Sequence, residues 1–236
     1  MFSAINFAGS QPFNDWFLPD TTQRHTLGLK VTGVDNFWGL GEFVYVKSND
    51  AILKGSLVAI NGTYNGVLLA STAGLGFPFG VAMAPMASGT FGWLQVAGLA
   101  VYKTNATVAA DVAVAVAAAG IAGTLAAGKQ LMGVRNTVAA TGTKTVTAGT
   151  VNGTGVLTTG GYDGFFIGMA LSGTGIPAST VVARLDADGR TIYTGSAIET
   201  LGDKNSTATG SITLTGTYTG FGQGFIMSPH SQGQIL

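Results

Sequence analysis

Side chains that alternate with a period of two between positions 39 and 60 constrain this chain to an extended backbone. Residues 43–46 read Phe-Val-Tyr-Val, so aromatic and β-branched side chains alternate as they do in a β-strand. A second apolar run, Leu57–Ile60, precedes Asn61-Gly62, a pair that tolerates positive φ and connects hairpin strands. Because strands and turns recur along most of the chain, we expect an all-β fold. It should have a barrel-like or sandwich-like core domain, a second small β domain and extended terminal segments.

The alanine-rich stretch 106–127 is open to two interpretations. Its alanine content allows a helix, or even a membrane span. Valines at positions 112, 114 and 116 instead alternate with alanines, and Asp111 and several glycines interrupt the apolar run. We therefore predict a strand, a turn at Ala119-Gly120 and a second strand, with no membrane span.

Composition divides the chain into four expected parts. We expect an N-terminal arm over 1–24, a core β domain with two related hairpin units over 25–140, a small β domain over 141–216 and a C-terminal tail over 217–236. The small domain begins with a threonine- and glycine-rich stretch that is either a linker or an exposed edge strand, and alternating threonine favours the strand.

Two short patterns give further expectations. Gly92–Val96 and Leu99–Tyr102 should form separate strands divided by Ala97-Gly98, and Phe165–Ile167 should form a strand of the small domain.

Charged residues make up only 9% of the chain, and the formal net charge is zero. A near-neutral surface gives no electrostatic attraction to phosphates, which argues against nucleic-acid binding. No Asp, Glu, Lys or Arg occurs between Gly55 and Tyr102. A surface so poor in charge predicts that another subunit covers part of it, so we expect a homo-oligomer.

Residues with catalytic or metal-binding chemistry are few. The two histidines, His25 and His230, lie near opposite ends of the chain, and there is no cysteine. Glu42 with Asp35 is a possible carboxylate pair, but no pattern marks these two residues as a glycosidase site. The stretch Asp186–Gly189 resembles the start of a calcium loop, yet no glutamate closes it, so we predict a hairpin turn. We therefore expect no enzyme activity, no metal and no cofactor.

Aromatic residues supply the candidate contact residues. Residues 1–24 hold five aromatics among small polar residues, either as an ordered loop or as an arm that contacts a neighbouring subunit. Two further phenylalanines flank Pro78, which favours a sheet edge. The candidates for contact with another subunit or a partner protein are Phe2, Phe7, Phe13, Trp16, Phe17, Phe77 and Phe79.

Several short stretches resemble the head decoration proteins, or capsid cement proteins, of tailed bacteriophages. These stretches are Asp20–Arg24, Gly39–Lys47, Pro78–Ala82, Gly92–Gln95 and Gly128–Leu131. A later stretch also resembles a small β module that recurs in phage structural proteins; it comprises Ser172–Pro177, Thr180-Val181 and Asp188–Thr191.

The resemblance implies an all-β virion protein on the outer surface of the capsid, bound to the major capsid protein and often trimeric. The family has no catalytic residues to carry over to this chain. Two alternatives remain: a tail- or fibre-associated phage protein that binds a host receptor or glycan, and a carbohydrate-active enzyme.

Overall fold

The computed structural model describes residues 3–4, 18–35, 39–162, 164–186, 188–197, 200–201 and 203–232. In these ranges it contains strands, turns and no helix, which confirms the all-β prediction. The same ranges therefore contain no helix that could span a membrane. The chain forms two compact units, a smaller one of residues 141–219 and a larger one of residues 2–140 with 220–236.

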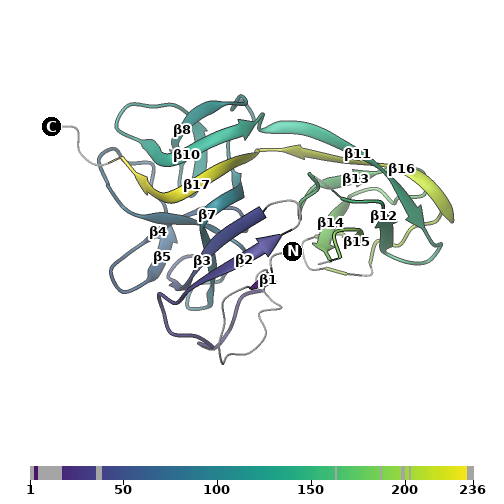
Figure 1. Cartoon of the computed structure of the whole chain (residues 1–236), viewed down its shortest axis with the longest axis horizontal. Helices are drawn as coiled ribbons and strands as arrows, with labels where there is room; N and C mark the ends of the chain where they lie inside the picture. The colour runs from purple at the N-terminus through teal and green to yellow at the C-terminus, as the bar shows by residue number, and fades with distance from the viewer. Residues whose placement is uncertain are drawn as a thin grey trace. The chain divides into compact units, whose positions relative to one another are not determined.

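The larger unit is built on one sheet with the strand order β1-β2-β3-β5-β4-β6-β7-β17-β10-β8-β9 (Figure 1). Its strands are β1 (Ser3–Ala4), β2 (Lys30–Asp35), β3 (Gly39–Ser48), β4 (Leu57–Ile60), β5 (Asn65–Leu68), β6 (Phe79–Ala82), β7 (Phe91–Lys103), β8 (Val112–Ala118), β9 (Ile121–Thr124), β10 (Gln130–Val138) and β17 (Phe221–Ser231). Strand β3 also pairs with β7, so β3, β5, β4, β6 and β7 close into a ring, which we call the five-strand ring.

The five-strand ring has apolar side chains on both faces of its strands. Alternate residues of β3, β4 and β7 fill its interior in one cluster: Val44, Val46, Ile52, Val58, Ile60, Ala82, Met86, Leu94 and Val96. In β4, Leu57 and Ala59 point the other way, into a second cluster shared with β8, β10 and β17. Burial on both faces explains why β4 reads as a continuous apolar run.

The β8–β9 hairpin confirms the strand interpretation of the alanine-rich stretch. Its turn lies at Ala119-Gly120, and Gly120 has a φ of +71°. Val114 and Val116 are almost completely buried in the second cluster. Strand pairing and burial of the valines therefore outweigh the helix propensity of the alanines.

The prediction of two strands divided at Ala97-Gly98 is wrong, because β7 is continuous. Its first half pairs with β3 and its second half with β17, and the change of partner occurs at Ala97. Gly98 has a φ of +98°, and a Cβ there would lie 2.2 Å from the carbonyl oxygen of Leu40. The Gln95 amide donates to the carbonyls of Ala97 and Leu99, both at 3.1 Å. The glycine thus bends the strand without ending it.

The expected C-terminal tail, 217–236, is also a wrong prediction. Residues 217–219 complete β16 (Gly210–Thr219), and β17 pairs with both β7 and β10 inside the larger unit. The smaller unit is therefore inserted in the sequence between β10 and β17. At this junction the Gly220 N–H donates to the Ala140 carbonyl at 2.8 Å.

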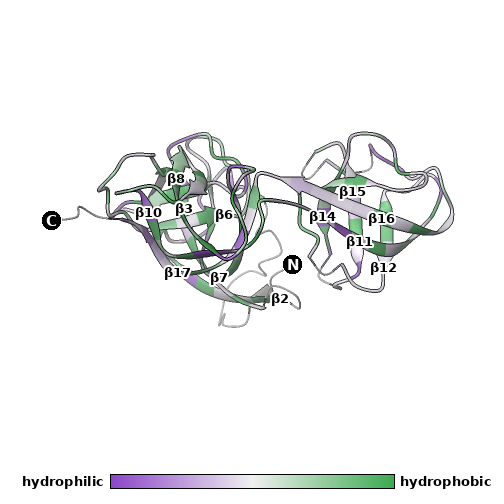
Figure 2. Ribbon diagram, turned by 90° about the horizontal axis from the view of Figure 1, so that it is seen from above, coloured by the Kyte–Doolittle hydropathy of each residue, from purple (hydrophilic) through white to green (hydrophobic). Residues whose placement is uncertain are grey.

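The smaller unit is a closed barrel with the strand order β11-β12-β15-β14-β13-β16. Figure 2 shows apolar residues along strands of both units. Its other strands are β11 (Thr141–Thr150), β12 (Val156–Thr159), β13 (Ala170–Ser172), β14 (Thr180–Leu185) and β15 (Thr191–Gly195). Strand β11 pairs with β16 along its whole length but with β12 only at Ala148–Thr150, so the threonine-rich stretch is not a linker, and its residues 141–147 form a largely exposed strand that is paired on one side. Phe165–Ile167 is a buried turn rather than a strand, and Phe165 packs against Gly216.

A buried polar network joins β7 to β10. The Tyr102 hydroxyl donates to Asn136 Oδ1 at 2.9 Å, and Asn136 Nδ2 donates to the carbonyls of Ala109 and Val138. Both side chains are fully buried. Each polar atom of Asn136 therefore has a partner that no water could replace without opening the core.

We expect Asn136→Ala to lower the free energy of unfolding by about 2–4 kcal/mol, because it leaves a hydroxyl and two carbonyls without a partner. The control Tyr102→Phe removes one hydrogen bond of the same network and should cost about 1 kcal/mol. Urea unfolding followed by tryptophan fluorescence measures both. If both variants lost the same free energy of unfolding, the Asn136 amide would contribute no more to stability than its single hydrogen bond with Tyr102.

Candidate functional site

The structure separates the aromatic residues that the sequence proposed as contacts. Phe2, Phe7, Phe13, Trp16 and Phe17 lie outside the described residues, so their role stays a prediction. Phe77 is 44% exposed and Phe79 only 1% exposed. These last two line the same cavity, Phe77 at its rim and Phe79 at its floor.

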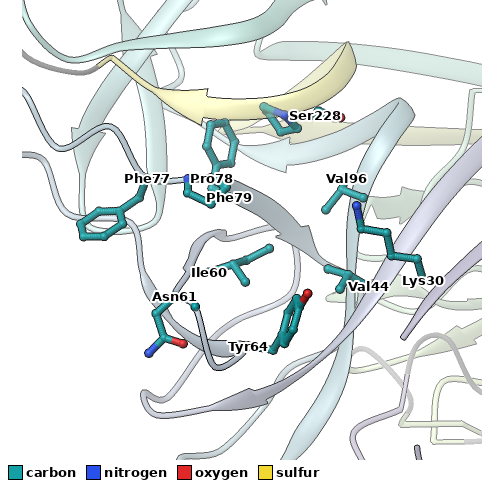
Figure 3. A pocket seen from close by; sticks show the side chains of 12 residues that line it. Lys30, Val44, Ile60, Asn61, Tyr64, Phe77, Pro78, Phe79, Val96 and Ser228 are labelled. Atoms are coloured by element: carbon teal, nitrogen blue, oxygen red, sulfur yellow. The ribbon is translucent and has the colours of Figure 1, made fainter. Parts of the chain in front are cut away.

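This cavity has a volume of about 450 Å³ and opens at one end of the five-strand ring (Figure 3). Its floor is apolar, since Val44, Ile60 and Val96 belong to the cluster inside the ring. The remaining lining residues come from β2, the β4–β5 turn, the segment before β6 and the end of β17. They are Lys30, Asn61, Gly62, Tyr64, Phe77, Pro78, Ser228 and Pro229. Binding sites commonly occupy such barrel mouths.

The β4–β5 turn forms one side of the cavity. Asn61 Oδ1 accepts hydrogen bonds from the backbone N–H groups of Thr63 and Asn65, both at 2.9 Å, which fixes the turn. Tyr64 then takes a φ of +58°, which is unusual for a residue with a side chain. Its ring lies against Gly28, where a Cβ would come within 2.3 Å of the ring.

A β-bulge forms the opposite side. Met132 pairs with His230 and Val134 with Ile226, so Gly133 alone faces three residues of β17. Ser228, in the middle of these three, has a φ of +43°. The bulge brings Ser228 and Pro229 to the cavity.

The lining is mostly apolar and uncharged. Among the described residues that line the cavity, Lys30 is the one charged side chain, and none is an Asp, Glu or His. Of the possible carboxylate pair, Glu42 is exposed on β3 and does not line the cavity, and the side chain of Asp35 is outside the described part of the chain.

A row of apolar side chains continues from the cavity across β2, β3, β7 and β17. We call it the apolar face; it consists of the exposed Val34, Leu40, Phe225 and Met227 and the half-buried Ala97 and Leu99. The exposed fractions of Leu40, Phe225 and Met227 are 57%, 60% and 75%.

Strand register places these residues on one side of the sheet. Phe225 pairs with Leu99, and Met227 pairs with Ala97. Ala97 in turn pairs with Glu42, which is two residues from Val44 in the cavity floor. Because paired residues project to the same side and alternate residues share a side, the apolar face and the cavity form one continuous surface.

The N-terminal side of the larger unit holds a cluster of polar and aromatic residues outside this surface. The Tyr45 hydroxyl donates to Asp20 at 2.6 Å, and Asp20 pairs with Arg24 at 3.0 Å. Burial, with the hydrogen bond to Asp20, raises the pKa of Tyr45 well above its usual value. His25 packs edge-on against Tyr45, at 5.1 Å between ring centroids. The cluster holds the segment before β2 against the ring.

We expect a mild loss of stability on acidification, because burial lowers the pKa of His25 below its usual 6.5, more than nearby Asp20 raises it. The unfolded chain then binds a proton more readily than the folded chain. The contribution of His25 is fully present above pH 6.5 and is lost as the pH falls through the lower, folded value. Thermal unfolding between pH 7.5 and 5 should depend less on pH in His25→Gln. Identical pH profiles for the two proteins would contradict this assignment.

The expected hairpin turn at Asp186–Gly189 is confirmed. Asp188 Oδ1 accepts from the N–H groups of Arg190 and Thr191, at 2.7 and 2.8 Å, and Gly189 has a φ of +73°. Slight burial acts to raise the pKa of Asp188, but a hydrogen bond from the Thr191 hydroxyl, together with these two backbone hydrogen bonds, lowers it overall. In the described part of the chain, no group of three His, Cys, Asp or Glu residues is placed to hold a metal ion.

Comparisons of the chain with protein-family models, with curated proteins and with solved structures each found no match. The functional interpretation therefore rests on the cavity and the apolar face. Sequence reasoning named Phe77, whose role as a contact stays a prediction, and did not name Leu40, Leu99, Phe225 or Met227. The only signal for the last two was their alternation around Ile226, which is also typical of a core strand.

Proposed function

We propose that this chain is a structural virion protein that binds the outer surface of a phage capsid and stabilises it, as a decoration protein does. The apolar face carries the proposal. Three of its large side chains are more than half exposed, on strands that are otherwise well packed. A contiguous exposed apolar surface of this kind is typical of an interaction site.

The surroundings of the apolar face also fit a protein interface. Glu42 lies on the same side of the sheet next to Ala97, and Arg135 pairs with Phe225, so charged side chains border an apolar centre. An apolar centre with a polar rim is the common arrangement of protein interfaces. The low charge of the chain and the stretches that resemble decoration proteins support the same assignment.

In this proposal the partners are the major capsid protein and further copies of the chain. A surface that contacts another copy is normally closed by symmetry. A trimer fits an icosahedral shell because three shell subunits meet at its three-fold and quasi-three-fold positions. We therefore propose a homotrimer seated at these positions.

Electron microscopy of virions labelled with an antibody against this chain tests the location. We expect label over the head of the particle, and label confined to the tail or fibres would replace this proposal with the receptor-binding alternative. Light scattering of the purified protein tests the trimer, with an expected mass three times the 23.8 kDa of one chain. If the purified protein were monomeric at all concentrations, the trimer would be contradicted. The location on the virion would still be tested separately by the microscopy.

A further inference from the structure

The cavity at the end of the five-strand ring combines three features that point to an occupant. Its floor is apolar, its rim holds the exposed aromatic rings of Tyr64 and Phe77, and Lys30 supplies a single positive charge. Figure 3 shows Lys30 and Phe77 on opposite sides of the cavity, with Ile60 between them. An apolar group that carries a negative charge near one end would match all three features.

The charge of Lys30 is not matched within the described part of the chain. Its side chain is exposed and forms no ion pair or hydrogen bond with a described residue. Asn61 lies across the cavity from Lys30 and offers a separate, uncharged donor (Figure 3). Its Oδ1 already accepts two backbone N–H groups and the Thr63 hydroxyl, so its Nδ2 is left as a donor. The rim therefore favours an acceptor with negative charge, such as a carboxylate.

Backbone strain marks the same place. Four described residues other than glycine have a positive φ, and two of them, Tyr64 and Ser228, line this cavity. Strained residues persist only where the surrounding structure fixes them, and they gather at ligand-binding positions. Here the turn hydrogen bonds of Asn61 fix Tyr64, and the bulge opposite Gly133 fixes Ser228.

We propose that the cavity receives an apolar side chain, aromatic or branched, from a segment of a partner protein, and that a carboxylate on the neighbouring residue pairs with Lys30. The partner is a protein chain because the cavity opens directly onto the apolar face, where a longer segment can continue. In this respect the inference rests on the proposed function. The cavity, which we call the socket, holds this side chain and thereby fixes the position of the partner segment along the apolar face.

Three synthetic tetrapeptides test the proposal on the full chain: acetyl-Gly-Asp-Phe-Gly-amide and two variants, with Asn for Asp and with Ala for Phe. Binding is followed by NMR chemical shifts of the labelled protein. We expect the Asp-Phe peptide to shift resonances of Lys30, Tyr64 and Phe77. The Asn-Phe peptide should bind about threefold more weakly, as for an exposed ion pair. The Asp-Ala peptide should bind at least about tenfold more weakly, because the floor loses its apolar contact.

Lys30→Gln provides the matched variant, since Lys30 is exposed and its replacement leaves the core intact. In this variant the two phenylalanine peptides should bind equally, while the dependence on phenylalanine remains. Equal binding of the Asp-Phe and Asn-Phe peptides to the unmodified protein would overturn the proposal. So would an absence of binding, shifts outside the cavity, or shifts produced by hexanoate but by no peptide.

Capsid attachment separates this inference from the proposed function. If the peptides fail to bind while the protein still attaches to phage heads, the socket is wrong and the function stands. If the peptides bind as expected but the protein does not attach to heads, the decoration function fails and the socket remains.

Discussion

Replacing Phe225 and Met227 together with aspartate is expected to weaken attachment to phage heads by at least about a hundredfold. Both side chains are more than half exposed, on β17 at one end of the apolar face. Large aromatic and apolar residues that anchor an interface often contribute about 2 kcal/mol or more each, and burial of carboxylates in their place adds to the loss. Under the proposed decoration function, co-sedimentation of the protein with phage heads measures the effect.

Two matched controls keep this result interpretable. Leu125 and Val151 are each 59% exposed and lie outside the apolar face, the first after β9 and the second after β11. Their single replacements by aspartate should leave attachment within about twofold. All the variants should unfold within about 1 kcal/mol of the original protein per substitution, because exposed positions contribute little to the core. Full attachment of the double variant would show that the apolar face is not the capsid contact.

Gly98→Ala is expected to lower the free energy of unfolding by about 3–5 kcal/mol, a large part of the stability of a typical domain. The alanine must hold a φ of +98°, which L-residues rarely adopt, and its Cβ would lie 2.2 Å from the Leu40 carbonyl oxygen. To remove this steric overlap, β3 and β7 must move apart at the position where the pairing partner of β7 changes from β3 to β17. Urea unfolding measures the loss.

Two other glycines separate the contributions of backbone strain and steric overlap. Gly39 has a φ of +70° but no described atom within 4 Å of its Cβ position, so Gly39→Ala should cost about 1–2 kcal/mol. Gly62 has neither a positive φ nor a close neighbour, and Gly62→Ala should change stability by less than about 0.5 kcal/mol. If Gly98→Ala cost no more than Gly39→Ala, the close approach of Leu40 to β7 would be contradicted.

The sequence by itself determined the strands whose pattern is local. Alternating valines and the Ala119-Gly120 turn predicted the β8–β9 hairpin, and Phe43–Val46 and Leu57–Ile60 predicted parts of β3 and the whole of β4. These predictions succeed because side-chain alternation and turn chemistry act over a few residues. The threonine alternation indicated a strand at β11, but its two partners, β12 and β16, lie elsewhere in the sequence.

Only the tertiary structure decided what depends on distant partners. In the sequence, Gly98 indicates a break between two strands. In the structure it lies within one strand, β7, whose first half pairs with β3 and whose second half pairs with β17. Phe225 and Met227 have the pattern of a core strand, and only the register of β17 on β7 shows that they face outward. The cavity needs residues from β2, β3, the β4–β5 turn, β6, β7 and β17, which no local pattern links. Alternation tells which side chains share a side of a strand, but whether that side is core or surface depends on which strands and turns pack over it.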